Sequence, residues 1–251
     1  MIKSFVCVCT GSKYGTKYVN ILYNMVKRHS TNVKFFVITD SKKDWHSDIN
    51  QLIVDPLYKT WWNKIHMFRD DIGLEGRVLF MDLDVVIIRN IDHLWEFEDD
   101  KFCIIQDFNR CRIPSYHVRN SSVMKFDAGK EVHVWEKFKN DPQRIIDRFR
   151  GDQDYMTHLY KGGLIWPHDW IMSYKWEIGL EPGEKKRSPH DKFVSERYTT
   201  ETYIKVKNGR KITKTRRKKQ NLPQDCAVIV FHGKPNPEEV TKDPLIIDNW
   251  K

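Results

Sequence analysis

The sequence predicts an α/β fold in which helices cover both faces of a mainly parallel sheet. Near-continuous apolar runs, typical of strands that are buried on both faces, occur at residues 4–10, 33–40 and 77–82. Segments with apolar residues at helical spacing separate them, at 18–29 and 61–71. Strands that alternate with helices favour parallel pairing through helical crossovers.

The first hundred residues supply most of the predicted sheet. The helix at 18–29 has Val19, Leu22 and Val26 on one face. Because Pro56 ends the run QLIVDP, we expect a third strand at 51–56. The predicted order is strand 4–10, helix 18–29, strands 33–40 and 51–56, helix 61–71 and strand 77–82.

The second half is more mixed. Residues 101–107 and 121–127 have the composition of strands, and 130–160 that of helices, with GDQDYM opening a helix at 151–156. Asn208-Gly209 between two alternating runs predicts a hairpin over 202–215. A last buried strand begins at Cys226. Without a linker or internal repeat, we expect one domain over 1–251.

The positive charge of the chain is local. The net charge is +9, but residues 183–220 hold fourteen Lys and Arg against four Asp and Glu, and the rest holds 29 against 30. This basic insertion is either a solvated surface or a docking site for nucleic acid or an anionic membrane.

Targeting signals are not visible in the sequence. No run approaches the roughly 20 apolar residues of a membrane span. The N-terminus is too quickly polar for a signal peptide, and the cysteine count of five is odd. We therefore expect reduced thiols and a cytoplasmic protein, with peripheral association at a membrane surface left open.

Two carboxylates interrupt the apolar stretch RVLFMDLDVVII. Asp82 and Asp84 follow a predicted strand, and burying either one unpaired would cost several kcal/mol. Two carboxylates at this spacing can hold one Mn²⁺ or Mg²⁺, which prefer oxygen ligands. The alternative for such aspartates is a helix cap or a surface turn.

A second candidate lies near the end of the last strand. His232 follows AVIVF, and a neutral imidazole there can complete a metal site. Gly233 allows close backbone approach, and Lys234 offers a positive charge to a phosphate. A lone histidine in a strand is also commonly structural.

These motifs, in this order, resemble the glycogenin-like retaining glycosyltransferases of the GT-A fold. The resemblance covers about residues 5–160 and 226–235. RVLFMDLDVVIIRNIDHLWE is similar to the DxD strand and its continuation, RNSSVMKFD to an Asn-Ser-Gly strand, RGDQDYM to a Gly-Asp-Gln helix start, and VIVFHG to the terminal His strand. The implied fold is a Rossmann-like mixed sheet, with a nucleotide-binding half (1–100) and a sugar and acceptor half (101–251) that carries a basic hairpin near the C-terminus.

The resemblance also implies a role for each matching position. Asp82, Asp84 and His232 would bind Mn²⁺ (or Mg²⁺), with Asp82 also near the ribose, and Tyr14 would stack on the uracil. Lys64 would touch the diphosphate or the sugar. The implied catalytic residues are Lys64, Asp152 and Gln153, and the donor-binding residues are Thr10, Tyr14, Asp82, Leu83, Asp107, Asn120 and Lys234.

Some of these positions have plain structural alternatives. Tyr14 could be an ordinary loop aromatic, Lys64 a solvated helix residue, and Asp152 an N-cap. The sequence also departs from the family: HGKPNP is shortened and lacks the family's Trp, and Ser122 replaces a Gly. Residues 161–225 match no part of the family.

The implied function is metal-dependent transfer of a sugar from a nucleotide sugar, a UDP-sugar by resemblance, with retention of configuration. The acceptor is a glycan, a lipid-linked group or a protein. The alternative is a protein that binds nucleic acid or an anionic membrane through residues 183–220, with the same fold but without transferase activity.

Overall fold

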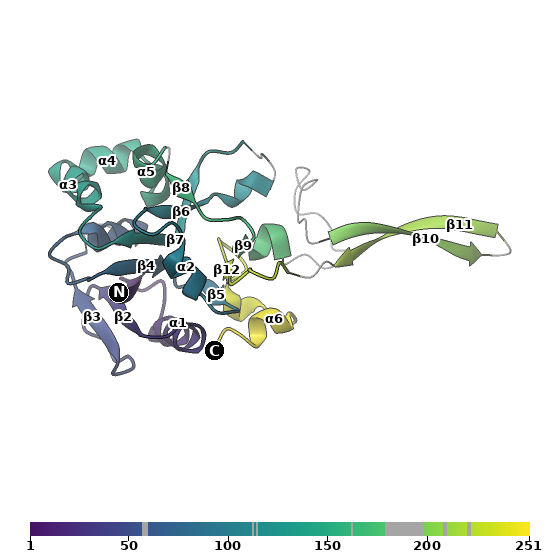
Figure 1. Cartoon of the computed structure of the whole chain (residues 1–251), viewed down its shortest axis with the longest axis horizontal. Helices are drawn as coiled ribbons and strands as arrows, with labels where there is room; N and C mark the ends of the chain where they lie inside the picture. Colours follow the sequence, from purple (N-terminus) through teal and green to yellow (C-terminus); the bar gives the residue numbers. More distant parts are fainter. Residues whose placement is uncertain are drawn as a thin grey trace.

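A seven-stranded mixed sheet forms the centre of the molecule. The computed structural model describes residues 1–56, 60–111, 113, 115–161, 163–178, 198–207, 210–219 and 222–251. The strand order is β3-β2-β1-β4-β7-β6-β8 (Figure 1). The bounds are β1 Lys3–Cys9, β2 Val33–Thr39, β3 Ile49–Ile53, β4 Arg77–Met81, β6 Cys103–Gln106, β7 Arg119–Asp127 and β8 Leu164–Ile165.

The pairing confirms the predicted parallel half. Strands β3, β2, β1 and β4 are mutually parallel, β7 lies antiparallel between β4 and β6, and β8 is parallel to β6. Two predicted elements differ from the structure. The third strand lies at Ile49–Ile53, earlier than expected, and the expected helix at 61–71 is the 3₁₀ helix η1, Thr60–Phe68.

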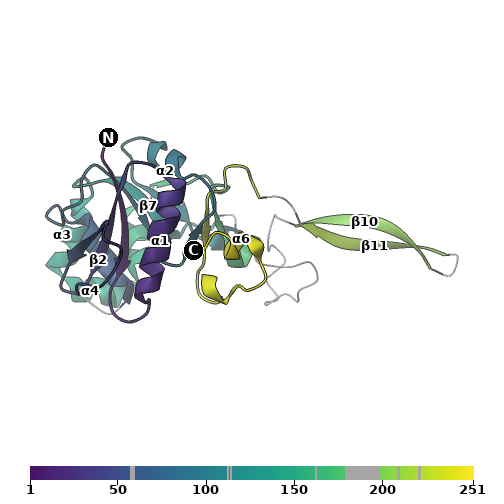
Figure 2. The ribbon, with the colours of Figure 1, turned by 90° about the horizontal axis from the view of Figure 1, so that it is seen from below.

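Each face of the sheet has its own apolar core. In β1, Phe5, Cys7 and Cys9 belong to the core on one face, whereas Val6 belongs to the other. Helix α1 (Thr16–His29) covers the first face, as Figure 2 shows. The second face is covered by η1, α3 (Val132–Asn140) and α5 (Asp152–Leu159). Because both faces are covered, β1 is a nearly continuous apolar run.

The shorter elements lie around these layers. The helices are α2 Asp92–Glu96, α4 Pro142–Arg148 and α6 Pro244–Ile247. The short 3₁₀ and π segments are η2 Phe108–Cys111, η3 Tyr174–Ile178 and η5 Pro237–Glu239. The expected helical region at 130–160 is therefore three separate helices, because Pro142 opens α4 and Gly151 precedes α5.

A small second sheet adjoins the first. Strand β12 (Val228–Val230) pairs antiparallel with β5 (Val85–Ile87) and parallel with β9 (Ile171–Ser173). Residues 82–84 connect β4 of the large sheet with β5 of the small one. The last strand therefore brings the residues after it to this connection: the Phe231 amide donates to the Asp84 carbonyl at 3.1 Å.

The basic segment includes a long hairpin. β10 (Tyr198–Lys207) and β11 (Arg210–Lys219) pair antiparallel from Tyr198↔Lys219 to Lys207↔Arg210. The hairpin predicted over 202–215 is confirmed and is longer than expected, and it extends away from the rest of the chain (Figures 1 and 2). Its predicted turn, Asn208-Gly209, and residues 183–197 lie outside the described residues.

None of the five cysteines, all of which are described, is in a disulfide. Among the helices of the described ranges, none is both long and apolar enough to cross a bilayer.

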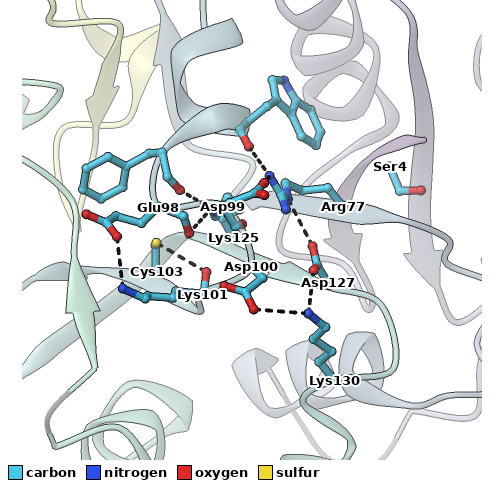
Figure 3. Close-up of polar contacts among 12 residues, drawn as sticks. Ser4, Arg77, Glu98, Asp99, Asp100, Lys101, Cys103, Lys125, Asp127 and Lys130 are labelled. Atoms are coloured by element: carbon cyan, nitrogen blue, oxygen red, sulfur yellow. Dashed lines mark hydrogen bonds and ion pairs between the residues drawn. The ribbon is translucent and has the colours of Figure 1, made fainter. Parts of the chain in front are cut away.

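A completely buried lysine ties β7 to the turn after α2. Lys125 is 0% exposed, and its Nζ donates to the carbonyls of Phe97, Glu98 (3.1 Å) and Asp99 (2.9 Å) (Figure 3). Beside it, the buried Arg77 guanidinium contacts the carboxylates of Asp99 (2.7 Å) and Asp127 (3.1 Å). The two side chains thus supply hydrogen-bond donors to polar groups of a turn that lies outside any strand or helix.

Replacing this lysine should destabilise the fold. We expect Lys125→Met to lower the free energy of unfolding by about 3 kcal/mol, because three carbonyls lose their buried donor. Urea unfolding followed by circular dichroism measures the change. The control is Lys101→Met, because that side chain is 62% exposed and pairs only with Glu98 at 3.1 Å among the described contacts; its effect should stay within about 0.5 kcal/mol. Equal losses in the two variants would refute the role of Lys125.

A buried histidine in η1 makes stability depend on pH. His66 is 2% exposed, its Nε2 lies 3.1 Å from the Asp55 carbonyl, and its Nδ1 lies 3.4 Å from the Arg69 guanidinium. Burial, with help from Arg69, lowers the pKa of His66. The neutral ring fits both neighbours, since one nitrogen donates to a carbonyl and the other accepts from an arginine.

Acidification should therefore destabilise the protein through His66. Because the folded pKa lies below the unfolded value, the unfolded chain binds the extra proton, and stability present above about pH 6.5 is lost as the pH falls. Between pH 7.5 and 5.5 this group should account for up to about 1.4 kcal/mol. Urea unfolding at both pH values should show a smaller difference for His66→Gln than for the wild type. The same difference in both would contradict the assignment.

Candidate functional site

The twin aspartates lie where the chain leaves the large sheet for the small one. Asp82 follows β4 and Asp84 precedes β5, while Leu83 between them is 2% exposed and packs in the core. The Asp82 amide donates to the Ser122 carbonyl of β7 at 2.9 Å, which holds this connection against the sheet. The two carboxylates are therefore at the edge of the core.

Lys64 of η1 compensates the charge of Asp82. Its Nζ lies 2.8 Å from one Asp82 oxygen, 3.5 Å from Asp152 and 3.3 Å from the Ser121 hydroxyl. Burial alone would lower the pKa of Lys64, but the carboxylates of Asp152 and Asp82 raise it overall. The lysine is thus a buried, permanent cation, and the alternative of a solvated helix residue is wrong.

Asp152 stands at the start of α5. Gly151 is the N-cap, and the Asp152 side chain makes no capping bond, so the capping alternative is wrong. Its Oδ2 accepts from the Ser121 hydroxyl at 2.6 Å. Burial raises the pKa of this carboxyl, against the opposing effects of Lys64 and Ser121. The result is a carboxylate held by two donors at the N-terminus of a helix.

Three amide and carboxylate side chains form a second chain of hydrogen bonds. Asn120 Nδ2 donates to Gln153 Oε1 at 3.2 Å, and Gln153 Nε2 donates to Asp107 Oδ2 at 3.1 Å. Asn120 and Asp107 are buried. These groups come from β7, α5 and the end of β6, and they place several oriented donors and acceptors next to Asp152, as a sugar pocket requires.

Tyr14 contacts Asp84, the second aspartate of the pair. The Tyr14 hydroxyl donates to Asp84 Oδ2 at 2.8 Å, and its ring lies 4.8 Å from that of Tyr18. Burial and the negative charge of Asp82 raise the pKa of Asp84 to about 6. Thr10 is joined to η1, because Asn63 Nδ2 donates to its hydroxyl at 3.0 Å.

His232 lies two residues after β12 and is held by neighbours of its own. Its Nε2 lies 2.6 Å from the Ser173 hydroxyl, and its ring stacks on Phe108 with centroids 5.3 Å apart. Burial lowers the pKa of His232 to about 4, so the ring is neutral at pH 7. A neutral imidazole is the form that binds a metal.

Asp82 and Asp84 supply carboxylate oxygens, which are the ligands that a divalent cation such as Mn²⁺ or Mg²⁺ prefers. Asp84 has a raised pKa partly because Asp82 is so near, which is the electrostatic sign of two carboxylates whose charge is incompletely balanced. In the described ranges no three His, Cys, Asp or Glu side chains are gathered as metal ligands, and His232 Nε2 is engaged by Ser173. The metal site, with Asp82, Asp84 and His232 as its ligands, therefore stays a prediction.

Lys234 is set apart from the other candidates. Its ammonium pairs with Glu239 at 2.5 Å, and its side chain is 75% exposed. The structure therefore joins Lys64 to Asp82 and Asp152, Asn120 to Gln153 and Asp107, and Tyr14 to Asp84. Among the described contacts, the hydrogen bonds of Thr10, His232 and Lys234 go to residues outside these three groups.

Several contributors were missed in the sequence. Ser121 bridges Lys64 and Asp152, Ser173 holds His232, Asn63 joins Thr10, and Phe108 stacks on the histidine. Asn63, Ser121 and Phe108 had a signal, since each is adjacent to a predicted site residue. Ser173 lies in the region 161–225, which matches no part of the family.

Comparison with solved structures identifies the fold. The structure of the galactosyltransferase LgtC, in complex with donor and acceptor sugar analogs, aligns with this chain at a TM-score of 0.61 and 14% sequence identity. The alignment covers 98% of this chain and 96% of LgtC. The glycosyltransferase GlyE from Streptococcus pneumoniae TIGR4, in its apo form, has a TM-score of 0.52 and 13% identity, over 68% of this chain and 46% of GlyE. No protein-family model and no curated protein matches the sequence. The chain therefore has a GT-A glycosyltransferase-like fold.

Proposed function

We propose that the chain is a glycosyltransferase that moves a sugar from a nucleotide sugar to an acceptor. The main observation behind this proposal is that carboxylate oxygens of Asp82 and Asp152 both lie within 3.5 Å of Lys64 Nζ. The hydrogen-bonded side chains of Asn120, Gln153 and Asp107 lie beside them. The GT-A-like fold and its resemblance to LgtC support this reading. LgtC was solved with donor and acceptor sugar analogs, which favours a sugar acceptor here as well.

The donor would lie across the junction of the two sheets. Tyr14 would stack on the base, a UDP-sugar being our proposal, and Thr10 and Leu83 would line the nucleotide side. Asp82 and Asp84, with His232 as third ligand, would hold Mn²⁺ or Mg²⁺, which when bound would neutralise charge on the diphosphate. Asp107, Asn120 and Gln153 would bind the sugar hydroxyls, while Lys234, which pairs with Glu239, would have to turn to reach a phosphate.

The charges of the site suit the bond changes of transfer. As the bond between sugar and phosphate breaks, the electron pair stays with the diphosphate, and the Lys64 ammonium stabilises that charge. The sugar becomes cationic, and the Asp152 carboxylate stabilises it. The acceptor oxygen forms the new bond to the same sugar carbon on the leaving-group face, so that configuration is retained, and its proton passes to the departing diphosphate.

A screen of nucleotide sugars tests the proposal without a known acceptor. We expect the full chain with Mn²⁺ to hydrolyse at least one of the UDP-, GDP-, ADP-, dTDP- and CMP-sugars slowly, releasing the nucleotide, and EDTA to abolish the release. If none is hydrolysed and none raises the melting temperature, the proposal fails. Neither the fold nor the similar structures favour the alternative of a nucleic-acid-binding or membrane-binding protein without transferase activity.

A further inference from the structure

Two adjacent tryptophans in η1 have opposite environments. Trp62 is 4% exposed and stacks on Phe138, with ring centroids 5.4 Å apart. Trp61 is 49% exposed. A single exposed apolar side chain is ordinary, so the position of Trp61 has to decide whether it has a function.

The helix type aligns Trp61 with the site. In a 3₁₀ helix, with three residues per turn, side chains at i and i+3 lie one above the other. Trp61 is three residues before Lys64 in η1. Lys64 points to Asp82 and Asp152, so Trp61 lies on the same face, about 6 Å farther along the helix axis toward its N-terminus.

Contact with α5 places the indole more closely. A Cβ added to Gly151 would lie 2.4 Å from Trp61 Nε1 and 2.9 Å from Cδ1. The backbone of Gly151 is extended (φ −178°), a conformation open to any residue, so the close indole is what excludes a side chain here. One edge of the indole thus packs on the residue directly before Asp152.

From this placement, we propose that Trp61 is a stacking platform for a pyranose ring of the acceptor. The inference rests on the proposed function. The faces of an indole are electron-rich, and the C–H groups on one face of a pyranose carry the complementary partial charge. A ring on Trp61 would have its hydroxyl groups near Asp152, where the sugar is transferred.

The donor sugar is the less suitable occupant. The polar side chains proposed to bind the donor sugar, Asn120, Gln153 and Asp107, include the residue directly after Asp152. Trp61 instead contacts Gly151, the residue directly before Asp152. The base has its own aromatic partner in Tyr14. The platform therefore fits the remaining substrate, the acceptor.

Kinetics with simple acceptors tests the platform. The probes are methyl α- and β-hexopyranosides at millimolar concentration, added to the nucleotide sugar that the wild type hydrolyses best. We expect Trp61→Ala to raise the KM of the accepted pyranoside about tenfold and to lower the ratio of transfer to hydrolysis similarly, with Trp61→Phe in between. The control is Trp135→Phe, outside the site and stacked on His66 with centroids 5.4 Å apart, which should leave the acceptor KM within twofold.

A second variant moves the indole without removing it. In Gly151→Ala the added methyl group would displace Trp61 and should also raise the acceptor KM. If it acts through Trp61, it should add little in the Trp61→Ala background. Full additivity of the two effects would show that the contact between Gly151 and Trp61 does not matter for the acceptor.

Binding is measured separately by saturation-transfer NMR, so that the two proposals can fail independently. Pyranoside binding by the wild type and its loss in Trp61→Ala support the platform, even if no nucleotide sugar is hydrolysed and the proposed function fails. An unchanged acceptor KM in Trp61→Ala overturns the platform. So does the absence of any pyranoside binding to a wild type that hydrolyses its donor.

Discussion

Replacing Lys64 with methionine should reduce turnover by about a thousandfold. The ammonium is the buried cation that Asp82 and Asp152 share, at 2.8 and 3.5 Å. Removing one preorganised group that stabilises developing negative charge typically costs a factor of about 10² to 10³. Here the loss should lie at the upper end, because two carboxylates also lose their partner and would repel the diphosphate. Release of nucleotide from the best donor, per folded molecule, measures the effect.

A double variant separates lost chemistry from lost stability. Lys64→Met leaves Asp152 buried with only Ser121 as its donor among the described contacts, and breaking such a buried pair costs about 3–5 kcal/mol. Lys64→Met/Asp152→Asn removes both charges, so its melting temperature should recover while its activity stays low. The control is Lys34→Met, whose side chain is 58% exposed and pairs with Glu75 at 3.4 Å. More than a tenth of wild-type turnover in Lys64→Met would show that Lys64 is only structural.

Asp84→Asn should remove metal-dependent turnover, by at least about a hundredfold, and should stabilise the fold. The loss follows from taking one oxygen charge out of a two-carboxylate site. The gain follows from burial and Asp82, which raise the pKa of Asp84 to about 6. A carboxyl whose folded pKa exceeds its unfolded value weakens the fold above about pH 6 and has no such effect below about pH 4.

Two measurements test these opposite effects of Asp84→Asn on turnover and on stability. Titration of Mn²⁺ against nucleotide release should show no saturable activation in Asp84→Asn. Unfolding at pH 7.5 should show a gain on the order of 2 kcal/mol, which shrinks toward pH 4 as the wild-type carboxyl becomes protonated. Asp44→Asn, at an exposed position, is the control for both. Mn²⁺-activated turnover at the wild-type rate would exclude Asp84 as a ligand, whatever the stability.

Local patterns were enough for most of the fold. The apolar runs that became β1, β2 and β4 could be recognised because a strand covered on both faces has few polar positions. The hairpin at β10 and β11 followed from Asn208-Gly209 between alternating runs. Helix type was less predictable: the apolar residues of 61–71 suit both a helix of 3.6 residues per turn and the 3₁₀ helix that packing selected.

By itself, the sequence determined most strands of the large sheet, where the aspartate pair interrupts them, and the order of motifs that resembles a GT-A transferase. Only the tertiary structure decided the partners. Lys64, Asp82 and Asp152 are brought together by η1, β4 and α5, and His232 meets Ser173 only because β12 pairs with β9. The same holds for Trp61, which sits against Gly151 while its neighbour Trp62 is buried. The pattern of apolar and polar residues along a segment predicts which of its side chains are buried. Which distant side chains come into contact depends on strand order, strand register and helix orientation, and these are not encoded in neighbouring residues.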